Sequence, residues 1–80
     1  MNIGEAVKLR ILELCRTYDI SINRLCTMSG ITQSTVNNIV NGRNNSTTIS
    51  TIKKICDGLN ITVEDFFHSE LFRGLEQEIK

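Results

Sequence analysis

Gly30 divides the middle of the chain into two short apolar patterns, and this division constrains the fold more than any other feature. Ser21 is a good N-cap and opens the first pattern. Thr32 caps the second pattern, which runs over residues 33–41. A glycine between them supplies the positive φ that a helix commonly needs just after its last turn. The sequence therefore predicts two short helices joined by a tight turn, the arrangement of a helix-turn-helix motif.

The spacing around the turn predicts how the second of these helices is held. Cys26 is small where the two helices must approach closely, and a β-carbon at Gly30 would clash in the turn. Val36 and Ile39 attach the second helix to the core. Because these positions face inward, the opposite side of residues 33–41 must face outward.

The remaining apolar residues predict three further helices, and so a small all-α domain of five helices. A first helix covers about residues 4–18, a fourth runs over 49–59 behind Thr48, and a fifth follows Thr62. Asn60 ends the fourth helix in a left-handed conformation, and Asp65 completes a partial capping box with Thr62. Expected inward positions are Val7, Ile11, Leu14, Cys15 and Tyr18; Leu25 and Cys26, with Met28 as a further candidate; Ile49, Ile52, Ile55, Cys56 and Leu59; and Val63, Phe66 and Phe67.

The domain is expected to cover residues 1–68, with residues 69–80 as a tail. A further helix in the tail would be weakened by Gly74, by about 1 kcal/mol relative to Ala. The apolar residues near this end exceed what a helix and tail of this size need to cover, so we predict a two-fold dimer contact here. The alternative is that they fold back onto the first helix. These residues are Phe67, Leu71, Phe72 and Leu75; a further helix in the tail, left open here, would be lined by Leu71, Phe72, Leu75 and Ile79.

The formal net charge is zero, but the charges are segregated. Residues 20–56 contain four basic residues and no acid, whereas residues 57–80 carry a net charge of −4. Such a chain can present one face to phosphates and keep the other away from them. No stretch approaches the roughly 18 apolar residues of a membrane span, and no signal peptide is visible. We therefore expect a cytoplasmic protein.

Three cysteines, Cys15, Cys26 and Cys56, and one histidine, His68, are the candidate metal-binding or redox residues. No two cysteines have the two-residue spacing of a metal or redox pair, and each lies in an apolar helical pattern. We expect buried thiols, with zinc binding or redox sensing as the alternative, and no metal or cofactor. The chain contains no Ser/His/Asp set, carboxylate pair or glycine-rich phosphate loop, so we expect no enzyme.

The outward side of residues 33–41 carries only uncharged polar side chains, where an ordinary surface helix mixes Glu, Lys and Arg. Gln and Asn can make paired hydrogen bonds to adenine, and Ser can donate or accept. Carboxylates here would be repelled by phosphates. A neutral solvated face is the alternative. The predicted base-reading residues are Gln33, Ser34, Asn37 and Asn38.

Phosphate contacts are expected on both sides of this helix. The start of the helix after Ser21 offers free N–H groups and the positive end of the helix dipole. Thr48 opens the fourth helix in the same way, and Lys53 and Lys54 add to the local field. The predicted phosphate-binding residues are Ser21, Asn23, Thr32, Thr35, Asn41, Arg43 and Asn44.

Over about residues 3–67 the sequence resembles the phage repressor and Cro family of helix-turn-helix regulators, also called the xenobiotic-response-element family. It is most similar to small stand-alone regulators of Gram-positive bacteria. The resemblance implies that Gln33, Ser34 and Asn38 contact bases and that Asn41-Gly42 lies against the DNA backbone. Ile22 stands where members often have Gln, and Ser46-Thr47 where they often have Pro. The matching segments are Ile20-Ser21, Leu25-Cys26, Ser29 to Val36, Asn41 to Arg43, Thr48 to Cys56 and Leu59 to Phe67.

Two functions follow as hypotheses. The first is a transcriptional regulator, expected to be a repressor, that binds double-stranded operator DNA as a homodimer, because one small domain offers few contacts and a dimer doubles them. The second is a protein-interaction module of the same fold, resembling an antitoxin or a partner-controlled regulator, which would use the acidic, apolar tail. The uncharged helix beside a basic segment favours the first hypothesis.

Overall fold

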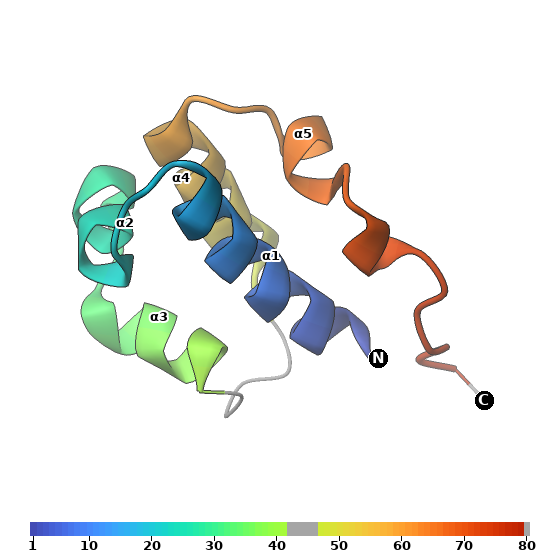
Figure 1. The fold of residues 1–80 in the computed structure, drawn as a ribbon. Helices are drawn as coiled ribbons and strands as arrows, with labels where there is room; N and C mark the ends of the chain where they lie inside the picture. The colour runs from blue at the N-terminus through green and yellow to red at the C-terminus, as the bar shows by residue number, and fades with distance from the viewer. Residues whose placement is uncertain (42–46, 80) are drawn as a thin grey trace.

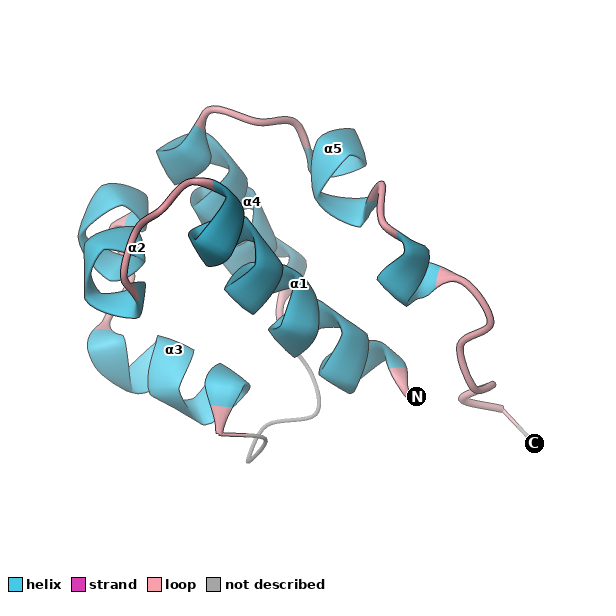
Figure 2. Cartoon of the chain, in the orientation of Figure 1, coloured by secondary structure: helices cyan, strands magenta, loops and turns pink. Residues whose placement is uncertain are grey.

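The computed structural model describes residues 1–41 and 47–79, which form five α-helices and one short 3₁₀ helix, with no strand among them (Figure 2). The predicted all-α class is confirmed. No described helix has the length and apolar character that crossing a bilayer requires. The helices are α1 (Ile3–Thr17), α2 (Ile22–Ser29), α3 (Gln33–Val40), α4 (Ile49–Leu59) and α5 (Val63–Phe67), followed by the 3₁₀ helix η1 (Glu70–Phe72).

Each α-helix starts behind a side chain that accepts a hydrogen bond from a backbone N–H of the first turn. The predicted caps Ser21, Thr32, Thr48 and Thr62 are confirmed. Asn2 caps α1, so that helix begins slightly before the predicted boundary.

Two of the predicted helix ends are also confirmed. Gly30 follows α2 with φ 67° and Asn60 follows α4 with φ 58°, both in the left-handed region. Asn41 is the C-cap of α3. The stop predicted at Gly42 lies outside the described residues.

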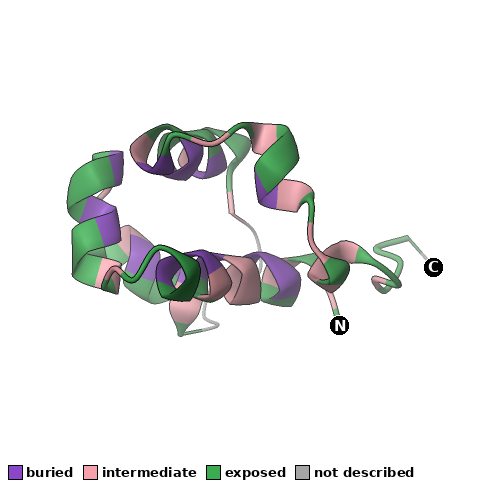
Figure 3. Ribbon diagram, turned by 45° about the horizontal axis from the view of Figure 1, so that its top comes forward, coloured by how far each residue is buried: buried purple, intermediate pink, exposed green. Residues whose placement is uncertain are grey.

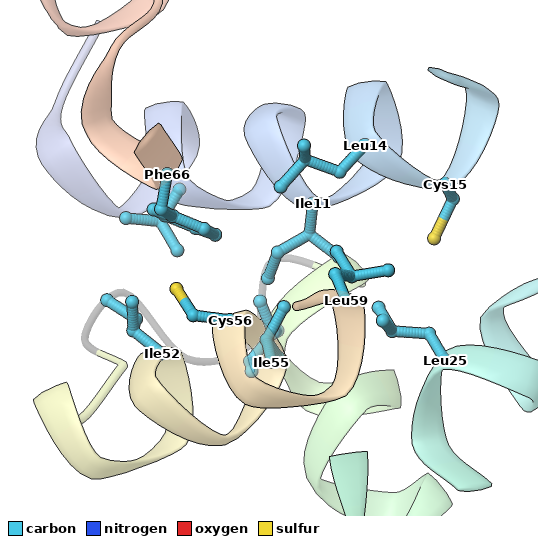
Figure 4. Close-up of a cluster of buried hydrophobic side chains, with 11 residues drawn as sticks. Ile11, Leu14, Cys15, Leu25, Ile52, Ile55, Cys56, Leu59 and Phe66 are labelled. Atoms are coloured by element: carbon cyan, nitrogen blue, oxygen red, sulfur yellow. The ribbon is translucent and has the colours of Figure 1, made fainter. Parts of the chain in front are cut away.

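The core lies where α1, α2, α4 and α5 meet, with Ile39 of α3 packed into it, and Figure 4 shows apolar side chains converging there. Ile11, Leu25, Ile55 and Phe66 are completely buried. Figure 3 shows buried positions along the inner sides of the helices and exposed positions outside them. One small core therefore fixes the helix pair α2–α3 on one side and the C-terminal segment on the other.

Three residues predicted to face inward are exposed instead. Tyr18 (46% exposed) is the C-cap of α1, so it lies beyond the last helical residue and does not continue the buried side of the helix. Ile49 (68%) is the first residue of α4, and Met28 (37%) lies in the last turn of α2. These residues follow the apolar period but lie at helix ends, where packing against neighbouring helices is incomplete.

The cysteines Cys15, Cys26 and Cys56 are free and buried, as predicted. Burial raises the pKa of all three thiols, and the charge of Cys26 adds to the effect on Cys15. Each therefore behaves as a small apolar residue at neutral pH. The structure holds no group of three or more metal-ligating side chains within its described residues.

The tail folds back along α1, as Figure 1 shows, and its end lies near the N-terminus. Of the further helix considered for the tail, only η1 forms among the described residues, and Gly74 has φ 66°, outside the α-helical region. The rings of Phe67 and Phe72 pack with centroids 4.9 Å apart, and the Met1 ammonium lies 3.3 Å from the Glu76 carboxylate. In the monomer this segment thus adopts the folded-back alternative, and a dimer contact here stays a prediction.

Candidate nucleic-acid interface

The helices α2 and α3 are joined by Gly30, Ile31 and Thr32 in a tight turn. The predicted clash of a β-carbon at Gly30 is wrong, because nothing lies within 4 Å of the position that such an atom would occupy. The left-handed φ alone favours glycine here. Ile31 packs partly buried against the core, and Thr32 starts α3 immediately.

The packing of α3 decides which of its side chains are presented to the outside. Val36 is completely buried and Ile39 is 3% exposed, as predicted. The four predicted base-reading residues are all exposed. Residues four apart on a helix are neighbours on its surface, so these side chains form two adjacent rows. They are Gln33 with Asn37, and Ser34 with Asn38. We call these four residues the α3 face.

Asn23 links the start of α2 to the start of α3. Its Oδ1 accepts a 2.6 Å hydrogen bond from Gln33 Nε2. The neighbouring Ile22 packs partly buried against the core, which leaves Asn23 on the outer side. The structure therefore brings together a predicted phosphate-binding residue and a predicted base-reading residue, ten positions apart in the sequence.

The predicted phosphate-binding residues Thr32 and Thr35 form the start of α3. Thr32 Oγ1 accepts from the backbone N–H of Thr35, and the two hydroxyls lie 2.8 Å apart. The same pairing of Thr48 with Thr51 starts α4, with hydroxyls 2.9 Å apart. Ser21 Oγ caps α2 by accepting from Arg24 N–H at 3.0 Å. Each of these three starts lacks an acidic residue in its first turn.

Two predicted phosphate-binding residues, Arg43 and Asn44, lie outside the described residues. Asn41 is exposed at the end of α3. Lys53 differs from the prediction, because its Nζ lies 2.5 Å from the Asp57 carboxylate. This hydrogen bond and the charge of Asp57 raise the pKa of Lys53. The pair partly cancels the field expected from Lys53, and Lys54 keeps its exposed position.

Sequence reasoning missed Arg10, which holds the C-terminal segment in place. Its side chain is 13% exposed; Nε donates to the Phe66 carbonyl at 2.6 Å and Nη2 to the Asp65 carbonyl at 2.8 Å. It also pairs with Glu13, whose carboxylate accepts from Ser69. The last carbonyls of a helix lack full intrahelical bonding, and Arg10 bonds to two of them in α5; the Asp65 carbonyl also accepts from the His68 N–H. The sequence offered one signal for this role: Arg10 directly precedes the buried Ile11, so its side chain starts at the edge of the buried side of α1.

Gly58 was missed as well. It lies inside α4, where an added Cβ would be 2.6 Å from Ser29 Oγ and 2.9 Å from the Met28 carbonyl oxygen. A close approach of α2 and α4 therefore occurs at Gly58; the approach of α2 to α3 predicted at Cys26 stays a prediction. A glycine inside a helical pattern signals such an approach of two backbones.

Comparison with known proteins connects this geometry to a family. Residues 10–70 match the model of the Cro/C1-type HTH DNA-binding domain. The chain belongs to this family. The matched region contains the whole helix-turn-helix unit, α4, α5 and the start of η1. Membership places the chain among DNA-binding transcription regulators of the helix-turn-helix type.

A solved structure supports the same assignment. The Cro/C1-type chain is similar to the crystal structure of the prophage Lp1 protein 11, with a TM-score of 0.79 and 42% sequence identity. The match covers 88% of this chain and 93% of that chain. The search of curated proteins gives no match. The resemblance to phage repressor and Cro proteins is thus confirmed at the level of family and fold.

Proposed function

We propose that this Cro/C1-type domain is a transcriptional repressor that binds specific double-stranded DNA and reads the major groove with α3. One observation carries the proposal: the α3 face is uncharged, exposed and held rigidly by Val36 and Ile39 beneath it. The major groove admits an α-helix and presents a distinct pattern of donors and acceptors for each base pair. A protein bound at a promoter excludes other proteins from it, and repression is the direct consequence.

Gln33 is the first residue of α3 and the best placed for base reading, because recognition helices contact bases mainly through their N-terminal residues. Its hydrogen bond to Asn23 fixes the amide before DNA arrives. Among the described residues, the amide oxygen and the second N–H of Gln33 form no other hydrogen bond and can make the paired contact of Gln with adenine. A side chain that is oriented in advance loses less conformational freedom on binding.

The starts of α2, α3 and α4 are proposed to hold the DNA backbone. Their first-turn N–H groups and the positive ends of their dipoles attract phosphates, and no carboxylate neutralises them from within the first turn. Ser21 and Thr48 contribute hydroxyl groups beside these N–H groups. Such contacts position the domain without specifying sequence.

Binding as a homodimer is part of the proposal. Specific protein–DNA interfaces typically bury about 1,000–2,500 Å² of protein surface, which one domain of this size covers poorly. Two copies on a palindromic site place two α3 helices one helical turn of DNA apart. Sedimentation of the chain with and without operator duplex tests this part. A complex that contains one chain per palindromic site at saturation contradicts the dimer.

Selection from random DNA, followed by titration at several salt concentrations, tests the main proposal. Gln33→Ala should weaken binding to the selected operator by about 1–3 kcal/mol and leave scrambled duplex nearly unchanged, with relaxed preference at one or two base pairs. Gln77→Ala, in the exposed tail, is the matched control and should change neither. Equal weakening on operator and scrambled duplex would mean that α3 is not the reading element.

A further inference from the structure

The last turn of α2 crosses α4 at a point where α4 contributes no side chain. On α4 the crossing point is Gly58, where an ideal Cβ would lie 2.6 Å from Ser29 Oγ, 2.9 Å from the Met28 carbonyl oxygen and 3.0 Å from the Met28 carbonyl carbon. These separations are shorter than ordinary van der Waals contact. Two of the three atoms belong to the α2 backbone, so a β-carbon at this position must move α2 itself.

Ser29 is the α2 side of this crossing. It is 8% exposed, and its Oγ is buried without a hydrogen-bond partner among the described residues. Buried hydroxyls normally have such a partner. The hydroxyl therefore contributes shape here, since it occupies the space that a side chain on Gly58 would need.

The crossing lies directly before the turn that leads into α3. Met28 and Ser29 precede Gly30, and Gln33 follows three residues later. Thr48, at the start of α4, belongs to the same rigid helix as Gly58. The contact thus sets the distance between the element proposed to read bases and one of the elements proposed to hold phosphates.

We infer that Gly58 is a positioning residue for DNA recognition: its missing side chain sets where the α2–α3 unit lies relative to α4. This inference rests on the proposed function. Base contacts from α3 and phosphate contacts from α4 must form at the same time on a rigid duplex. A displacement of α2 by a few tenths of an ångström then affects sequence reading more than general DNA affinity, because flexible phosphate contacts tolerate it better.

The test is a double-mutant cycle on the full chain with the selected operator and a scrambled duplex. Gly58→Ala should reduce operator affinity on the order of tenfold, with less than about a twofold change on scrambled duplex. Adding Ser29→Ala removes the atom at 2.6 Å but leaves the Met28 carbonyl oxygen at 2.9 Å. The double variant should therefore regain part of the preference for the operator, and Ser29→Ala alone completes the cycle.

Gly74→Ala is the matched control. This glycine has φ 66° and lies in the tail with nothing within 4 Å of an added Cβ, so alanine strains the backbone far from the DNA-facing elements. It should lower stability and leave the ratio of operator to scrambled affinity unchanged. A change in that ratio therefore separates positioning from stability.

Backbone amide chemical shifts provide a readout that needs no DNA. Gly58→Ala should shift the amides of α3, and Ser29→Ala should move them back toward the wild-type positions. Unchanged α3 shifts, an unchanged affinity ratio in a folded protein, equal losses on both duplexes, or no relief by Ser29→Ala would each overturn the inference. So would unfolding of both the single and the double variant. A wild-type chain without operator preference refutes the proposed function instead, and the amide shifts then still decide the role of Gly58.

Discussion

The five helix starts of this molecule fall into two groups that differ at one position. In α1 and α5 the third residue is acidic, and its carboxylate accepts a hydrogen bond from the backbone N–H of the cap: Glu5 from Asn2, and Asp65 from Thr62. In α2, α3 and α4 the third residue is Arg24, Thr35 and Thr51. All five starts are capped, but only α1 and α5 neutralise their own dipole with a carboxylate.

The same division holds for the other polar groups. At the C-terminal end, Arg10, Glu13 and Ser69 bond to one another or to the carbonyls of α5. Within the described residues, the side chains of Ser34, Asn37 and Asn38 form no hydrogen bond. One end of the molecule thus uses its polar groups to hold its own chain, and the other presents them outward. Polar groups that the fold itself does not bond remain available for contacts with another molecule.

The largest expected effect on stability comes from removing the hydrogen bonds that hold the C-terminal segment to α1. Arg10→Ala removes charge-assisted hydrogen bonds to two carbonyls of α5 and should lower the free energy of unfolding by about 2–3 kcal/mol. Urea denaturation measures this loss. Arg16→Ala, on the exposed side of α1, is the control and should stay within about 0.5 kcal/mol of wild type. Equal stability of the two variants would show that the C-terminal segment does not depend on Arg10.

Substitutions at Gly30, in the turn between α2 and α3, should change stability according to the backbone conformation that the new residue tolerates and not according to its volume. Gly30→Val should lower the free energy of unfolding by about 1–3 kcal/mol, because a β-branched residue is strained at φ 67°. Gly30→Asn should lose less, since Asn tolerates the left-handed region and an added Cβ meets nothing within 4 Å. Melting temperatures compare the two. A loss for Asn as large as that for Val would contradict a cause in the left-handed backbone conformation.

The three buried cysteines of the core predict that the free energy of unfolding depends on pH. Burial raises the pKa of Cys15, Cys26 and Cys56. Above the unfolded thiol pKa of about 8.5 the unfolded chain loses these protons while the folded chain keeps them, so stability falls as pH rises further. Urea denaturation between pH 7 and pH 10 measures the decline, and Cys26→Ala should make it shallower. A decline of the same steepness in that variant would assign it to other groups.

Sequence reasoning found the features that depend on neighbouring residues. The caps, the left-handed Gly30 and Asn60, and the exposed polar positions of α3 all follow from local pattern and spacing. Arg10, Gly58 and the bond from Asn23 to Gln33 were missed because each depends on where two distant segments meet. The error at Ile49 has a related origin, since periodicity marks a face of a helix but not how far its neighbours extend. Gly74 had left a tail helix open in the sequence, and its φ of 66° shows that the backbone there is not α-helical.

The smallest expected effect on stability is the sharpest test of the comparison. Thr35→Glu converts the start of α3 into the kind of start that α5 has, with an acidic third residue that can bond back to the cap. It should raise the free energy of unfolding by about 0.3–1 kcal/mol through the helix dipole. The added carboxylate also lies beside the α3 face, where it repels phosphates. Binding to operator and scrambled duplex should therefore both weaken by several-fold at low salt, and the difference should shrink as salt screens the charge.

Two matched variants separate charge from shape in this test. Thr35→Gln keeps a side chain that can complete the capping box but adds no charge, so it should bind DNA more tightly than Thr35→Glu at every salt concentration. Asp65→Thr makes the opposite exchange in α5 and should lower stability by about 0.3–1 kcal/mol while leaving DNA affinity unchanged. If Thr35→Gln weakened binding as much as Thr35→Glu, the cause would be the size of the side chain. If Asp65→Thr altered DNA affinity, the two groups of helix starts would not be separate in function, because the start of α5 would then act on the same DNA as the start of α3.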